Sequence, residues 1–270
     1  LANKDREIKR VEGIYRRNVE GAGAKVFDTR ATLANANTVV LAADGRKVTA
    51  KTILIATGGH PVKPDVPGAE HAITSNEAFQ LEELPASILI VGGGYNAGIA
   101  SIEKNWSDYT VTMKDGSTVD VECVMFATGR TPSTADLGLD KIGVKLGKDG
   151  EILVDDQSRS SVANIYAVGD VTNRVTLTPV AIREGHAFAD TVFGNKPWMV
   201  NHEQVPTAVF STPEIGTVGL PEHVATERYP KLDVYHARFR PLKNTVSGRC
   251  AKTIVGSSNR IATPVARTFM

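Results

Sequence analysis

The sequence has 270 residues, enough for about two ordinary domains of ~150 residues and for a sizeable core. Its 31 basic and 30 acidic residues give a net charge of +1, so charge indicates neither nucleic acid nor an anionic membrane as a partner. Apolar residues make up 41% of the chain, and no apolar run approaches the roughly 20 residues that span a bilayer. The two cysteines, Cys123 and Cys250, are too far apart to indicate a disulfide framework or a zinc site. The first residues do not form a signal peptide, so we expect a cytoplasmic protein without nucleic-acid, membrane or metal partners.

The first predicted element is an amphipathic surface helix over residues 5–20, where apolar side chains recur every three or four positions among charges. Two segments with alternating polarity follow, at 25–32 and 37–42, and they are typical of strands. The turn Asp44-Gly45 then predicts a hairpin.

Four short apolar runs come next, and their composition predicts strands that are buried on both faces. Each run ends at or just before a glycine, and two of them end in the same Ala-Thr-Gly sequence. The runs cover residues 53–56, 88–91, 123–127 and 164–168. A strand that stops at glycine lets a ligand approach the backbone, and ligands in open α/β sheets bind beyond the carboxyl ends of the strands. A single Ala-Thr-Gly could equally be a plain tight turn.

A helix is predicted after the fourth strand, with Thr178 as N-cap, Pro179 as the first helical residue and the pair Gly194-Asn195 at its end. Short strands and turns dominate after Val205. Residues 201–204 are therefore the predicted domain boundary.

The glycines after the second strand fit an Ala-ended dinucleotide fingerprint, Gly92-x-Gly94-x-x-Ala97. Glycine at the first two positions would permit the tight turn and the close approach of a pyrophosphate. However, residues 96–101 are too short for a crossover helix, and a strand-like segment at 109–113 follows instead. The triplet could therefore also be an ordinary glycine turn.

Asp170 follows the glycine at the end of the fourth strand, where its carboxylate could accept hydrogen bonds from the hydroxyl groups of a ribose-like ligand. The helix that begins near Thr178 would offer backbone N–H groups to an anionic part of that ligand. The simpler interpretation of Asp170 is a capping residue in a turn.

In combination and in this order, these segments resemble the flavoprotein disulfide reductases, the class I pyridine nucleotide-disulfide oxidoreductases. The matching segments are residues 53–59, 88–95, 126–132, 165–171 and 177–181. Further segments resemble the glutathione reductase branch of that family, at residues 73–77, 191–197, 209–216 and 238–242. The resemblance extends to about Cys250.

The resemblance implies an α/β fold with two Rossmann-like nucleotide-binding domains, for FAD and NAD(P), and an α+β interface domain that forms a homodimer. The expected ranges are 1–60 and 128–200 for the two parts of the FAD domain, 61–127 for the NAD(P) domain and 201–270 for the interface domain, each incomplete.

The resemblance also implies roles for individual residues. Asp170, with Gly169, would contact the flavin ribityl and pyrophosphate region, and Thr178, preceded by Leu177, would meet the flavin ring through its backbone. The FAD site would be lined by Ala56, Thr57 and Gly58, with Ala31 near the adenine. Gly92 and Gly94 would begin the NADPH site, and Gly129 and Arg130 would lie near the meeting point of the two cofactors.

The implied activity is the reduction of glutathione disulfide by NADPH through FAD and a pair of cysteines. The sequence lacks the family's FAD fingerprint, its Cys-x-x-x-x-Cys pair and its His-Pro motif, so no catalytic residue is assigned. His186 stands where some glutathione reductases have a substrate-binding arginine, so a trypanothione or dihydrolipoamide type of reductase is an alternative. A catalytically inactive interaction module is another.

The missing motifs have two explanations: a remnant that has lost its chemistry, or segments of a longer chain joined together. We favour the second explanation, with a break between Tyr95 and Asn96. It predicts that the Cα atoms of these two residues lie much farther apart than the ~3.8 Å of a trans peptide.

Overall fold

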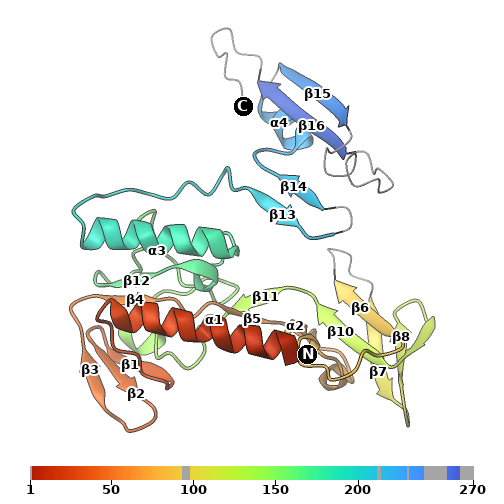
Figure 1. Cartoon of the computed structure of the whole chain (residues 1–270), viewed down its shortest axis with the longest axis horizontal. Coiled ribbons are helices and arrows are strands. Elements are labelled where there is room, and N and C mark those ends of the chain that lie inside the picture. The colour runs from red at the N-terminus through yellow and green to blue at the C-terminus, as the bar shows by residue number, and fades with distance from the viewer. Residues whose placement is uncertain (1, 93–97, 212–213, 230, 240–253, 262–270) are drawn as a thin grey trace. The chain divides into compact units, whose positions relative to one another are not determined.

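The computed structural model describes residues 2–92, 98–211, 214–229, 231–239 and 254–261 (Figure 1). The chain divides into two compact units, Leu1–Val200 and Asn201–Met270. In the part of the chain that is described, no helix is long and apolar enough to cross a membrane.

The first unit contains helices and two kinds of sheet. Its helical segments are α1 (Ala2–Gly21), η1 (Ala69–His71), α2 (Ser75–Ala78), η2 (Asp140–Ile142), η3 (Gly169–Thr172) and α3 (Thr178–Val192). Its strands are β1 (Ala31–Asn35), β2 (Thr38–Leu41), β3 (Lys47–Thr49), β4 (Ile53–Ile55), β5 (Gly59–Pro61), β6 (Ile88–Gly92), β7 (Ile99–Lys104), β8 (Tyr109–Met113), β9 (Thr118–Val121), β10 (Cys123–Ala127), β11 (Arg130–Pro132) and β12 (Ile165–Ala167).

Two parallel strand pairs organise this unit. β4 pairs with β12, with Ile53 opposite Ile165, and β6 pairs with β10, with Gly92 opposite Ala127. The chain leaves the two pairs through β5 and β11, which pair with each other in antiparallel fashion. Two antiparallel sheets, β1–β2–β3 and β7–β8–β9, complete the unit.

Each parallel pair has its own hydrophobic core. The core beside β4 and β12 is made of Leu33, Ile55, Leu139, Val144, Ile152, Ile165, Ala167 and Val171. The core beside β6 and β10 is made of Ala72, Val91, Ile99, Ile102, Val111, Val121, Val124 and Phe126. The two strand ends that carry the Ala-Thr-Gly sequences are therefore each anchored in separate, close-packed apolar layers.

The second unit contains α4 (Glu222–Arg228) and two antiparallel strand pairs. The strands are β13 (Thr207–Val209), β14 (Ile215–Thr217), β15 (Leu232–Phe239) and β16 (Ile254–Ile261). β13 pairs with β14, and β15 pairs with β16 along eight residues.

Several predicted elements are found where the sequence patterns placed them. The predicted helix at 5–20 is α1, and the turn at Asp44-Gly45 joins β2 to β3 with Gly45 at φ 70°. The four apolar runs are β4, β6, β10 and β12. The strand predicted over 25–32 is wrong, because β1 begins only at Ala31. Residues before it turn back toward α1, where the Asp28 carboxylate lies 2.9 Å from Arg16 Nη1.

The predicted burial of all four strands on both faces is wrong for β4 and β6. Leu54 is 38% exposed, Ile88 is 40% exposed and Ile90 is 59% exposed. Alternate side chains of a strand point to opposite faces, so the Leu54 face of β4 and the shared face of Ile88 and Ile90 in β6 are not covered by the described residues. β12 and most of β10 are buried as predicted.

The predicted start of α3 is wrong by one residue. Leu177 is the N-cap in extended conformation (φ −127°), Thr178 is the first helical residue and Pro179 is the second. The Leu177 side chain has no polar group, so no side-chain hydrogen bond caps the helix. A further strand, β7, was not predicted.

Candidate functional site at the strand ends

The two Ala-Thr-Gly sequences lie at the ends of β4 and β10. The threonine of each one forms a hydrogen bond to the chain segment that follows the other. Thr57 Oγ1 donates to the carbonyl of Ser133 at 2.8 Å, and Thr128 Oγ1 donates to the carbonyl of Val62 at 2.7 Å. The backbone repeats this exchange, because the Ser133 N–H donates to Gly58 O and the Val62 N–H donates to Gly129 O. The repeated Ala-Thr-Gly sequence thus marks a reciprocal crossing of two chain segments.

The glycines of this crossing have backbone angles that favour glycine. Gly58 has φ 67° and Gly129 has φ 111°, and a Cβ atom added to either would meet open space. Ala56, Thr57 and Thr128 are exposed as well. Both glycines have a positive φ and no atom crowds them. The backbone conformation is therefore the reason for glycine at these positions, and the space beside them is open. A ligand can therefore approach both strand ends.

Asp170 joins the crossing from the end of β12. Its carboxylate lies 4.0 Å from Arg130 Nε, and the Arg130 guanidinium also donates to the Gly59 carbonyl. A Cβ atom on Gly59 would lie 3.6 Å from Asp170 Cβ. The structure thus brings together predicted site residues from three strand ends: Gly58, Gly129 with Arg130, and Gly169 with Asp170.

The N-terminus of α3 adds a backbone donor. Val180 and Ala181 donate to the Leu177 carbonyl and Pro179 has no N–H group, so Thr178 is the first-turn residue whose N–H has no partner within the described part of the chain. No acidic residue lies in the first turn. An exposed N–H at a helix start can donate to an acceptor of the flavin ring, and a carboxylate can accept from the ribityl hydroxyls, so the residues present fit FAD.

The remaining predicted site residues lie elsewhere. Ala31 begins β1 in the β1–β2–β3 sheet, and Gly94 lies outside the described residues. Gly92 ends β6, where a Cβ atom would come within 2.3 Å of the Ala127 carbonyl oxygen. Close approach of the neighbouring strand is therefore one reason why glycine stands at this position.

Replacing Gly92 by alanine is expected to destabilise the protein by about 1–3 kcal/mol, because the added methyl group forces β6 and β10 apart. The free energy of unfolding in urea measures this change. Gly185→Ala is the matched control: the residue lies in α3 with nothing within 4 Å of the added Cβ, so about 1 kcal/mol of stabilisation is expected. Equal unfolding free energies for the two variants would contradict the prediction.

A cavity of about 820 Å³ lies at the ends of β6 and β10, within the size range of nucleotide sites. Val91, Ile99 and Phe126 give it apolar walls, and Lys114, Asp115 and Thr128 supply polar groups. Its position beyond the carboxyl ends of a parallel pair is the one expected for a nucleotide in an α/β sheet. The cavity is therefore a candidate site for a nucleotide.

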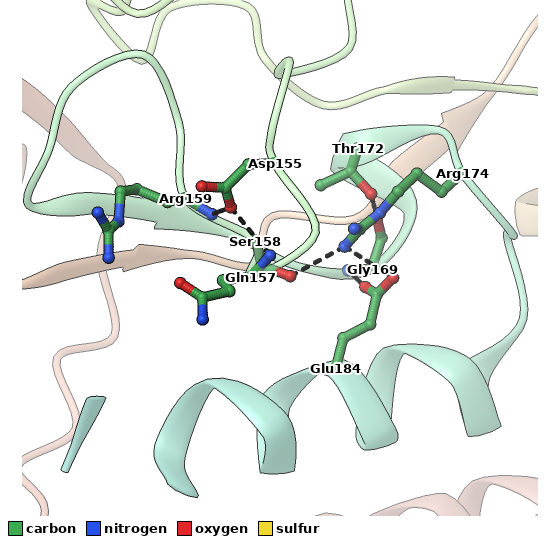
Figure 2. A network of polar contacts seen from close by, with 8 residues as sticks. All are labelled: Asp155, Gln157, Ser158, Arg159, Gly169, Thr172, Arg174 and Glu184. Atoms are coloured by element: carbon green, nitrogen blue, oxygen red, sulfur yellow. Dashed lines mark hydrogen bonds and ion pairs between the residues drawn. The ribbon is translucent and has the colours of Figure 1, made fainter. Parts of the chain in front are cut away.

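The sequence patterns missed a polar network around Gly169, the residue before Asp170 (Figure 2). Glu184 is 2% exposed and contacts Arg174 and the backbone of Gly169. A signal for it exists, because Glu184 stands four residues from both Val180 and Phe188 on the buried face of α3. A charged residue at such a position indicates a specific partner.

Cys123, the cysteine within the described residues, lies in an unreactive setting. Cys123 is buried in β10, and burial raises the pKa of its thiol, so the thiolate that attacks disulfides is disfavoured. Cys250 lies outside the described residues.

The chain matches the family model described as pyridine nucleotide-disulphide oxidoreductase at residues 2–99 and 95–185. It belongs to that family. Residues 205–256 match the model of the family's dimerisation domain. The predicted fold class, two Rossmann-like domains with an interface domain, is confirmed by these matches.

Relatives and solved structures agree with the family. A glutathione reductase from Burkholderia cepacia is 40% identical over 316 residues, covering 97% of this chain and 70% of the relative. A trypanothione reductase from Trypanosoma congolense is 40% identical over 263 residues, covering 77% of this chain and 54% of the relative. The flavoprotein disulfide reductase RclA from Escherichia coli has the same fold, with a TM-score of 0.85 at 20% identity, covering 95% of this chain and 71% of that structure.

The chain is shorter than the region it matches. The alignment with the Burkholderia relative extends over 316 residues, more than the 270 of this chain, so the relative has internal residues that this chain lacks. The two matched stretches of the family model meet at residues 95–99. Tyr95 and Asn96 lie outside the described residues, so the predicted break between them stays a prediction.

Proposed function

We propose that the full-length protein is a homodimeric flavoprotein that reduces glutathione disulfide with NADPH. The observation that carries the proposal is the convergence of Gly58, Arg130 and Asp170 from three strand ends beside the N-terminus of α3. The 40% identity to a glutathione reductase over 97% of this chain supports the choice of substrate. We place the protein in the cytoplasm.

In this proposal the FAD domain consists of residues 1–60 and 128–200. The Asp170 carboxylate accepts hydrogen bonds from the ribityl hydroxyls, and the Thr178 N–H faces the flavin ring. The exposed backbone of Ala56, Thr57 and Gly58 lies along the cofactor, with Ala31 toward the adenine. Bound FAD supplies a two-electron relay between a nicotinamide and a disulfide.

The NADPH domain consists of residues 61–127, with its cofactor at Gly92 and Gly94 beside the cavity at the end of β6. Gly129 and Arg130 lie between the two cofactors, where the positive charge of Arg130 favours an electron-rich flavin. One hydride from NADPH and one proton reduce one glutathione disulfide to two thiols. The cysteine pair for this exchange belongs to a part of the protein outside the present sequence, and residues 201–270 form the dimer interface.

A related flavoprotein reductase of trypanothione or dihydrolipoamide type is the second candidate. The Trypanosoma relative is as similar per residue, at 40% identity, as the glutathione reductase. A catalytically inactive interaction module is the third candidate.

The test uses purified full-length protein and measures bound flavin by its absorbance and NADPH oxidation by the loss of absorbance at the nicotinamide band. Glutathione disulfide is expected to support a rate at least about tenfold above that with trypanothione disulfide or lipoamide. A flavin-containing enzyme that prefers either of the other substrates would overturn the substrate assignment. A flavin-free protein that does not oxidise NADPH would favour the interaction module.

A further inference from the structure

Glu184 is the only charged residue among those buried on α3. The buried residues of the helix are Val180, Glu184, Ala187 and Phe188; Phe188 packs against Tyr166 of β12, and Glu184 is 2% exposed. Burying a carboxylate costs free energy that pairing offsets only in part, and an apolar residue at such a position is often as stable or more so. The presence of Glu184 therefore suggests a geometric role.

Each oxygen of Glu184 has its own partner. Oε2 accepts the Gly169 N–H at 2.6 Å, and Oε1 lies 2.9 Å from Arg174 Nη2 (Figure 2). Gly169 is the residue before Asp170, and it has φ 74°. The carboxylate thus holds the backbone at the point from which the Asp170 side chain extends.

The Gly169 carbonyl is held as well, because the Thr172 hydroxyl donates to it at 2.9 Å. The backbone N–H and the carbonyl of Gly169 therefore both have side-chain partners. The Asn173 N–H closes the turn by donating to the Asp170 carbonyl at 3.0 Å. The direction of the Asp170 side chain follows from the geometry of this turn.

The Arg174 nitrogen that faces Glu184 also contacts a second loop. Arg174 Nη2 donates to Ser158 Oγ at 2.9 Å, and Ser158 is itself buried with φ 61°. The Asp155 carboxylate accepts the N–H groups of Gln157 and Arg159, which fixes the loop around Ser158. The hydrogen bond to Ser158 restrains the guanidinium beside Glu184 Oε1, which favours one orientation of the carboxylate (Figure 2).

We propose that Glu184, oriented by Arg174, is a positioning residue for FAD: it fixes the Gly169 backbone so that the Asp170 carboxylate meets the ribityl hydroxyls. This inference rests on the proposed function, since it assumes that Asp170 binds FAD. Glu184 itself does not touch the cofactor.

The experiment compares three variants of the full-length protein by their dissociation constant for FAD, measured by flavin fluorescence on the apoprotein. Glu184→Leu removes the acceptor of the Gly169 N–H and is expected to weaken FAD binding about tenfold or more. This is the effect of losing the charge-assisted hydrogen bond between Asp170 and the ribityl hydroxyls. Glu184→Gln keeps an acceptor for the Gly169 N–H and is expected to recover part of the affinity.

The double variant E184L/R174M separates positioning from folding. It replaces the ion pair by apolar side chains, so the unfolding midpoint of the apoprotein in urea is expected to return to that of the wild type. FAD binding is expected to remain about tenfold weaker than in the wild type, because the Gly169 N–H still lacks its acceptor. Arg183→Leu, on the exposed face of the same helix, is the control and should leave the FAD dissociation constant unchanged.

Wild-type affinity in a well-folded E184L/R174M protein would overturn the inference and leave the proposed function standing. A wild-type protein that does not bind FAD would overturn the proposed function and the inference with it.

Discussion

Replacing Asp170 by alanine is expected to weaken FAD binding about 10- to 150-fold, with little change in the stability of the apoprotein. A hydrogen bond to a charged acceptor contributes about 1.5–3 kcal/mol, which corresponds to that range of dissociation constants. The ion pair that the variant also loses is long, at 4.0 Å, and Arg130 is 43% exposed, so its loss costs less than about 1 kcal/mol. Equilibrium dialysis against FAD and urea denaturation measure the two effects separately.

Two further variants make this test specific to position 170. Asp170→Asn keeps the shape and a neutral acceptor, so its FAD affinity should fall between those of the wild type and the alanine variant. Asp156→Ala removes an exposed carboxylate from a neighbouring turn and should bind FAD as the wild type does. Full FAD affinity in the alanine variant would show that the site lies elsewhere.

Replacing Phe126 by alanine is expected to lower the free energy of unfolding by about 3–5 kcal/mol. Its side chain is 1% exposed in the core beside β6 and β10, in a cluster with Val91, Val111 and Val124. The variant would lose this burial and leave a cavity among apolar side chains that cannot close fully. Urea denaturation followed by circular dichroism measures the loss.

Phe210→Ala is the control for the same change of side chain. Phe210 is 92% exposed, so the free energy of unfolding should change by no more than about 0.5 kcal/mol. A loss below about 1 kcal/mol in the Phe126 variant would mean that the core described around β10 is not closely packed.

The strand ends of the candidate site could be predicted because their signals are local. An apolar run that stops at glycine marks the end of a buried strand, and parallel pairing of β4 with β12 and of β6 with β10 brings such ends to the same edges. The position of Asp170 after Gly169 followed from the same pattern. These features need only the order of residues along each strand.

Other features depend on neighbours that no local pattern specifies. Whether Leu54 or Ile90 is covered depends on which layers pack beside β4 and β6, so burial on both faces was wrongly predicted. The network of Glu184 and Arg174 depends on loops that place Ser158 and Asn173 at positive φ, a conformation that neither residue type requires. A charged residue on the buried face of α3 could still have been noticed from its spacing alone.

The crossing of the two Ala-Thr-Gly segments has a consequence for how the connections between β4, β5, β10 and β11 move. Each threonine binds the segment that follows the other threonine, and each segment also receives a backbone hydrogen bond from its counterpart. Neither segment can detach without breaking the bonds of both. We therefore expect the β4–β5 and β10–β11 connections to open together in a single cooperative step, and not independently of each other.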